Sequence, residues 1–199
     1  MAALGLRERL PRGAVAELEA ATTDPDARVR AAAVAALVRA AGRTRAAAGW
    51  RRACRDAAAP VRRRTAELAP ELGEAASPRA LTTLLDDSDV TVVEAAAWAL
   101  GERAPSGPAR ARAVATLARL ATDHDDPLAR EAAVAALGAI GDPAGLAAVL
   151  AACTDKPAVR RRAVLALAPF AGPDVDAALA RALTDRDWQT RQAAEDLRD

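Results

Sequence analysis

Few residues of this 199-residue chain are suited to catalysis or metal binding. The one histidine, His124, lies in the run DHDD at positions 123–126, which offers an imidazole and several carboxylates to a cation. A calcium site needs more oxygen ligands on a shaped loop, so we interpret the run as a solvated turn that caps a helix. The cysteines, Cys54 and Cys153, form no CxxC pair, and we expect buried thiols instead of a disulfide or metal site.

Catalytic motifs are absent from the sequence. It contains no phosphate-binding loop, no GxSxG, no HExxH and no zinc-ligand spacing. The glycines of GAIG at 138–141 end a predicted helix and do not follow a strand, so they are not a dinucleotide motif. We therefore predict a protein that is not an enzyme and that uses no cofactor and no metal.

Positive charge is concentrated at the start of the chain. Residues 1–64 carry a net charge of +8 and the remainder −7, although the whole chain is near neutral at +1. A basic patch can bind nucleic acid through phosphates, but an aromatic content of 2% leaves few rings for base stacking. The positive charge would equally attract an acidic protein, and the opposite charges of the two ends of the chain would allow head-to-tail self-association. A third alternative is a solvated arginine-rich face without a partner. The arginines of this patch are Arg43, Arg45, Arg51, Arg52, Arg55, Arg62, Arg63 and Arg64.

Neither a secretory signal nor a membrane span is evident. The first residues, MAALGLRERLPRG, lack a continuous apolar core, and no apolar run approaches the roughly 20 residues that a spanning helix needs. We expect a cytoplasmic protein without a membrane partner.

The elements that position these side chains recur along the sequence. Six similar segments, such as VRAAAVAAL at 29–37 and VRRRAVLAL at 159–167, follow one another at spacings of 30 to 37 residues. Small or apolar residues recur within them at i, i+4 and i+7, which predicts one buried stripe on a helix. Fixed periods of this length indicate stacked supersecondary units.

A second helix precedes each of these segments. Four of its starts are marked by a residue followed by proline, at Ser77-Pro78, Gly107-Pro108, Asp142-Pro143 and Gly172-Pro173, and proline is favoured at the first helical position. No strand-like alternation occurs. We therefore predict an all-α fold of six helical hairpins in a single domain. The expected units are 1–42, 43–75, 76–106, 107–141, 142–172 and 173–199.

The segments DPDARVRAAAVAAL from Asp24 and DKPAVRRRAVLALAPFAG from Asp155 resemble HEAT repeats of the short bacterial class named after phycobilisome lyases. The resemblance implies a right-handed α-solenoid whose second helices line the concave side. It also implies a hydrogen-bonded ladder between an aspartate of each turn and an arginine of the second helix. Val93 stands where the third unit should carry its arginine. The matching pairs are Asp24 with Arg30, Asp56 with Arg62, Asp125 with Arg130, Asp155 with Arg160 and Asp185 with Arg191.

Enzymes of similar architecture fit the residues less well. Deoxyhypusine hydroxylases build an iron site from repeated His-Glu pairs, and this chain has a single histidine. Nothing identifies the tetrapyrrole pocket of a bilin lyase. DNA glycosylases built from helical repeats remain an alternative, because they use aromatic and acidic residues on a basic concave face.

Trp98 is the side chain best suited to binding a partner. It occupies the seventh position of its segment, opposite the buried stripe, and tryptophan anchors are common in protein interfaces. We predict an adaptor or scaffold that binds a protein or peptide around Trp98; the competing interpretation is that Trp98 fills a gap beside small alanines. We expect Trp50 in the core and Trp188 over the last unit. The candidate binding residues are Trp98, Glu94, Glu131, Arg63, Arg161 and Leu165.

Overall fold

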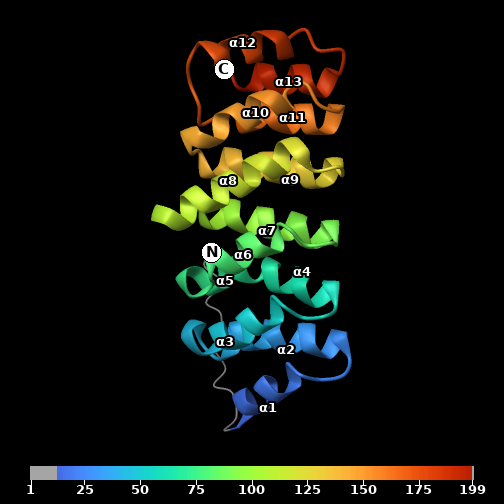
Figure 1. Cartoon of the computed structure of the whole chain (residues 1–199), viewed down its shortest axis with the longest axis vertical. Coiled ribbons are helices and arrows are strands. Elements are labelled where there is room, and N and C mark those ends of the chain that lie inside the picture. The colour runs from blue at the N-terminus through green and yellow to red at the C-terminus, as the bar shows by residue number, and fades with distance from the viewer. Residues whose placement is uncertain (1–12, 199) are drawn as a thin grey trace, which may run out of the picture. The chain divides into compact units, whose positions relative to one another are not determined.

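The structure is a computed structural model that describes residues 13–198 (Figure 1). The described residues form α-helices and two short 3-10 helices, and no strand occurs among them. The all-α prediction is therefore confirmed. The chain divides after Ser77 into two compact parts, which we call the N-terminal part (13–77) and the C-terminal part (78–198) and describe separately.

The N-terminal part is organised around helix α2, which packs against α1, α3 and α4. Trp50 is fully buried here, and its indole N–H donates a 2.7 Å hydrogen bond to the carbonyl oxygen of Thr65. The predicted core role of Trp50 is thus confirmed. The elements are α1 (Ala14–Ala21), α2 (Ala27–Ala40), α3 (Arg43–Ala53), α4 (Ala59–Glu67), α5 (Ala69–Leu72) and the 3-10 helix η1 (Gly73–Ala75).

The C-terminal part consists of two layers of helices (Figure 1). In one layer α7, α9, α11 and α13 each pack against the next, and in the other α6, α8, α10 and α12 do the same. Each helix of the second layer leads into its partner of the first, which gives four hairpins. The elements are α6 (Pro78–Leu84), α7 (Val90–Arg103), α8 (Gly107–Asp123), α9 (Pro127–Ile140), η2 (Pro143–Gly145), α10 (Leu146–Ala152), α11 (Pro157–Ala166), α12 (Pro173–Ala182) and α13 (Trp188–Asp196).

The helix starts follow the capping signals in most places. The carboxylate of Asp126 accepts a 2.8 Å hydrogen bond from the backbone N–H of Leu128 at the start of α9, and Asp26 does the same at α2. Pro78 and Pro173 begin their helices as predicted. Asp142 instead caps the 3-10 helix η2, and the regular helix α10 begins only at Leu146.

Small residues set the spacing between the helices of the first layer. A Cβ atom on Gly138 of α9 would lie 2.7 Å from the Cα atom of Ala166 in α11, too close for any side chain. A Cβ atom on Gly101 of α7 would lie 3.3 Å from the Cα atom of Ala136 in α9. Close packing of backbones therefore replaces the interlocking of large side chains in this layer.

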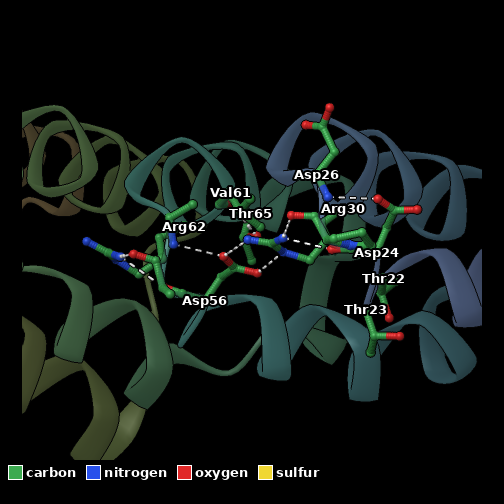
Figure 2. Close-up of polar contacts among 12 residues, drawn as sticks. Thr22, Thr23, Asp24, Asp26, Arg30, Asp56, Val61, Arg62 and Thr65 are labelled. Atoms are coloured by element: carbon green, nitrogen blue, oxygen red, sulfur yellow. Dashed lines mark hydrogen bonds and ion pairs between the residues drawn. The ribbon is translucent and has the colours of Figure 1, made fainter.

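At three junctions within the two parts, an arginine links one hairpin to the next through a carboxylate. The guanidinium of Arg30 donates two 2.7 Å hydrogen bonds to the carboxylate of Asp56, which lies in the following turn (Figure 2). Its third nitrogen donates a 2.8 Å bond to the backbone carbonyl of Asp24, in its own turn. One side chain thus closes its own turn and binds its neighbour, and Figure 2 shows the guanidinium between the two aspartates.

The C-terminal part repeats this arrangement. Arg130 binds the carboxylate of Asp155 at 2.6 and 2.8 Å, and Arg160 binds that of Asp185 at 2.9 and 2.8 Å. All five predicted pairs are hydrogen-bonded, but the carboxylate that joins two hairpins belongs to the following turn and not to the arginine's own turn. The aspartate of an arginine's own turn contributes a backbone carbonyl, as Asp185 does to Arg191 at 2.7 Å and Asp56 does to Arg62 at 2.8 Å.

These hydrogen bonds stabilise the ionised carboxylates. The arginine side chains hold the pKa values of Asp56, Asp155 and Asp185 below the usual aspartate value, although partial burial opposes the shift. The Arg160 and Asp185 side chains are only 8% and 17% exposed, so water screens this pair weakly. We call these arginine–aspartate links rungs.

Replacing Arg160 by methionine should destabilise the C-terminal part. The change leaves the Asp185 carboxylate and the Asp155 carbonyl without their donors, and we expect a loss of about 3 kcal/mol in the free energy of unfolding. Urea unfolding followed by circular dichroism measures the loss. Arg112→Met, at an exposed arginine of α8, is the control and should change stability by less than about 0.5 kcal/mol. Equal stability of the two variants would contradict the structural role of the rung.

Stability should also fall in acid. Because the pKa of Asp155 is lowered from 3.8 in the folded chain, its contribution is complete above about pH 5 and is lost as the pH falls through 3.8 and below. Asp155→Asn should therefore be less stable than the native chain at pH 7, and the difference should shrink by pH 2.5. Urea unfolding across this pH range tests the expectation, and a difference independent of pH would contradict it.

Candidate functional site

A groove of about 320 Å³ lies between α7 and α9 of the C-terminal part. We call it the Trp98 groove. Its walls belong to these two helices, and Arg162 of α11 closes one side. The lining residues are Glu94, Trp98, Gly101, Glu102, Leu128, Glu131, Ala132, Ala135, Ala136, Ala139 and Arg162.

One wall is a stripe of α7 on which Trp98 lies between two glutamates. Glu94, Trp98 and Glu102 are spaced four residues apart and therefore face the same side of the helix. Trp98 is 47% exposed, and its indole N–H makes no hydrogen bond with any described residue. Trp50, by contrast, is fully buried and hydrogen-bonded. Trp98 is therefore a surface residue and not a core residue.

The opposite wall is built from the small residues of α9. Ala132, Ala135 and Ala139 present only methyl groups to the groove, and Leu128 adds an exposed apolar side chain at the start of the helix. Their small size leaves the face of the Trp98 ring accessible from the groove. An apolar floor beside an aromatic ring suits the non-polar part of a ligand.

The charged residues of the groove are mainly acidic. Glu131 lies 3.5 Å from Arg162, so these two side chains largely neutralise each other. Glu94 and Glu102 are exposed, and neither forms an ion pair within the described part of the chain. The groove therefore presents two uncompensated carboxylates on either side of an indole ring.

The rung between α7 and α9 is replaced by an apolar residue and a histidine. Val93 holds the arginine position of α7 and is fully buried. The facing aspartate position is His124, whose Nδ1 atom accepts a 3.0 Å hydrogen bond from the Asp126 N–H, as the Asp24 carboxylate does from the Asp26 N–H. The aspartate position of this turn is thus His124 and not Asp125, which corrects the predicted register. Both partners of the rung have been replaced together.

The other predicted binding residues lie outside the groove. Arg161 donates a 2.6 Å hydrogen bond to the side-chain oxygen of Gln189, and Leu165 is 39% exposed on α11. Arg63 belongs to the N-terminal part and pairs with Glu67. The structure therefore brings together Trp98, Glu94 and Glu131 of the predicted set.

Among the large or charged side chains of the groove, sequence reasoning missed three. Glu102 could have been found, because it lies four residues after Trp98 on the same helical face. Leu128 and Arg162 come from other helices, and only the packing of α9 against α7 and α11 reveals them. Trp188, expected to cover the last hairpin, is 64% exposed at the start of α13, so that expectation is wrong.

The arginine patch of the N-terminal part is divided among several roles. Arg62 binds backbone carbonyls of its own turn, Arg45 pairs with Glu19, and Glu67 neutralises part of the charge of Arg63 and Arg64. Four exposed arginines of the patch form no ion pair with any residue from 13 to 198, and the one aromatic residue between them in sequence, Trp50, is fully buried and cannot stack on a base. These four are Arg43, Arg51, Arg52 and Arg55.

Cys54 is buried as predicted, whereas Cys153 is half-buried, so the prediction of two buried thiols holds only for Cys54. Burial raises the pKa of Cys54 to about 12 and that of Cys153 to about 11, so both remain protonated at neutral pH. Both cysteines are free, as predicted. In the described residues, no helix is both long and apolar enough to span a bilayer.

The repeats define the class of protein. The family of HEAT repeats matches residues 77–158 and 125–197, which together exceed half of the sequence, so this chain belongs to the HEAT-repeat family. The predicted resemblance is thereby confirmed. Repeat folds of this kind commonly serve protein–protein interaction. No curated protein gave a match to the sequence.

Solved structures share the fold. A designed armadillo repeat protein in complex with the peptide (KR)4 is 19% identical, with a TM-score of 0.66 over 93% of this chain and 99% of that chain. The CpcE and CpcF complex of phycocyanin lyase from Nostoc sp. PCC7120 is 22% identical, with a TM-score of 0.64 over 94% and 76%. An engineered protein is 22% identical, with a TM-score of 0.66 over 92% and 96%. At these identities the likeness concerns the fold alone.

Restoring the missing rung should stabilise the α7–α9 junction only when both partners are changed. Val93→Arg alone places a guanidinium at a buried site without a carboxylate, and we expect a loss of about 2–4 kcal/mol. His124→Asp in the same chain supplies the acceptor and should recover about 1–3 kcal/mol of this loss. Urea unfolding of the two single variants and the double variant forms a double-mutant cycle. Strictly additive effects would show that the two positions do not face each other.

Proposed function

We propose that this protein is a non-enzymatic adaptor that binds a segment of a protein partner in the Trp98 groove. The observation that carries the proposal is the half-exposed Trp98 ring beside an alanine wall, with an indole N–H that no described residue accepts. Tryptophan is enriched among the residues that dominate binding energy in protein interfaces. A ligand that covers the Trp98 ring and accepts a hydrogen bond from the indole N–H would bury the apolar surface of the ring and satisfy its one polar group.

Two further observations support a peptide or protein ligand. The groove is open to solvent and one of its walls is formed by short alanine side chains. This shape favours an extended or helical peptide segment over a small molecule that needs an enclosed pocket. The fold is also shared with a designed armadillo repeat protein that was solved with a bound peptide. The sequence-based expectation of a cytoplasmic location forms part of the same proposal.

Nucleic-acid binding and catalysis are less well supported by the geometry. The four arginines without an ion pair in the described residues have no exposed aromatic ring between them, and part of the surrounding charge is neutralised by Glu19 and Glu67. The groove itself offers carboxylates, which repel phosphate. Among the described residues, the lining of the groove contains no serine, threonine, cysteine or histidine that could act as a nucleophile or a general base.

A comparison of two exposed tryptophans tests the proposal. The native protein and the variants Trp98→Ala and Trp188→Ala, each immobilised at equal density, are used to capture partners from a lysate of the source cells. We expect Trp98→Ala to weaken recovery of a specific partner at least tenfold, which corresponds to about 1.4 kcal/mol. Trp188 is 64% exposed and outside the groove, so its variant should recover the partner at the native level.

Circular dichroism melting provides the structural control. Both tryptophans are surface residues, and both variants should melt within a few degrees of the native protein. Partner recovery that is unchanged in Trp98→Ala, or lost equally in both variants, would contradict a binding role for the Trp98 groove.

A further inference from the structure

The acidic groove points to the chemistry of its ligand. We propose that the Trp98 groove binds an extended peptide segment rich in arginine, with one guanidinium stacked on the Trp98 ring and its neighbours paired with Glu94 and Glu102. This inference rests on the proposed function, because it names the class of partner that the same groove accepts.

Charge selects the sign of the ligand. Glu94 and Glu102 have no cationic partner among residues 13–198, whereas Glu131 already has Arg162 at 3.5 Å. A protein surface that keeps two unpaired carboxylates beside an apolar ring attracts a cation and repels an anion. An acidic peptide, a phosphopeptide or a nucleic-acid strand would meet repulsion at both ends of the stripe.

Spacing selects the conformation of the ligand. Residues four apart on a helix are separated by about 6 Å along its axis, so Glu94, Trp98 and Glu102 form a row of sites about 6 Å apart. Alternate side chains of an extended chain are about 6.6–6.8 Å apart on one face. Side chains i, i+2 and i+4 of an extended peptide laid along α7 can therefore reach the three sites in order.

The ring selects arginine over lysine. Trp98 lies in the middle of the row, and a cation over an indole face is attracted by the ring electrons. The flat guanidinium stacks on the ring while its N–H groups remain free to bind the flanking carboxylates. An ammonium group is compact and strongly hydrated, so it gains less from the same position.

The alanine wall accommodates the remainder of such a peptide. Ala132, Ala135 and Ala139 leave space for the aliphatic stems of basic side chains, which commonly lie along apolar surface while the charged ends stay in water. The groove volume of about 320 Å³ is consistent with the partial burial of a few side chains and not of a folded domain. The ligand is therefore a linear segment of its partner.

Fluorescence anisotropy with a synthetic probe tests the inference. The probe is a fluorescein-labelled decapeptide of alternating arginine and serine, titrated with the full chain at 50 mM and 150 mM NaCl. Peptides of the same length with lysine or glutamate in place of arginine are compared with it. We expect saturable binding of the arginine peptide, at least threefold weaker binding of the lysine peptide and no binding of the glutamate peptide.

Matched variants separate the groove from general charge attraction. Glu94→Gln/Glu102→Gln should weaken binding of the arginine peptide at least tenfold. Glu17→Gln/Glu195→Gln removes the same charge from exposed glutamates outside the groove and should weaken it less than twofold. Trp98→Leu should remove the preference for arginine over lysine, because the apolar contact remains and the ring does not. The glutamate variants also test the inference if the tryptophan variant fails to fold.

The possible outcomes distinguish this inference from the proposed function. If the arginine peptide does not bind at 50 mM NaCl, or if the two glutamine double variants are weakened equally, the proposed ligand class is wrong. The adaptor role would still stand if a cellular partner is captured by the native chain and lost in Trp98→Ala. If neither peptide binding nor partner capture depends on Trp98, both proposals are wrong.

Discussion

At three junctions of this protein, the hydrogen bonds of one largely buried arginine side chain determine how neighbouring hairpins are joined. In Arg30, Arg130 and Arg160 a single guanidinium binds the backbone of its own turn and the carboxylate of the next turn. The planar arrangement of its N–H groups makes this possible, and lysine could not bind both partners with the same geometry. The link fixes the spacing of consecutive hairpins in a layer whose packing surface is mostly alanine, which by itself specifies position only weakly.

The Trp98 groove lies beside the junction that lacks such a link. Val93 and His124 replace both partners of the rung, so no charge is left buried without a counter-ion. The two helices remain close because Gly101 and Ala136 allow their backbones to approach. Close packing thus stabilises this junction, and Glu94 and Glu102 of α7 line the groove.

The sequence predicts the helices and hairpins because their period and capping residues are local properties. The same period places Trp98 opposite the buried stripe but leaves open whether its ring is exposed or fills a gap beside alanines, and the structure decides for exposure. Spacing along the chain identifies the aspartate nearest each arginine, which contributes its backbone carbonyl, but it does not identify the carboxylate of the following turn that completes the rung. Leu128 and Arg162 escaped prediction because three helices, far apart in sequence, form the groove. The exposure of Trp188 depends on what packs after the last turn, which no repeat pattern encodes.

The alanine content of the chain explains why so few residues determine its binding properties. Small side chains let the helices pack closely, but they also leave surfaces that are smooth and offer little contact area to a ligand. Specific recognition of a ligand then depends on the few large side chains at the surface and on the charged residues around them. In the C-terminal part these requirements coincide at one stripe of α7, where an indole ring lies between two unpaired carboxylates. A change of Glu94 or Glu102 should therefore alter ligand choice without affecting the fold, because neither side chain contributes to the packing between helices.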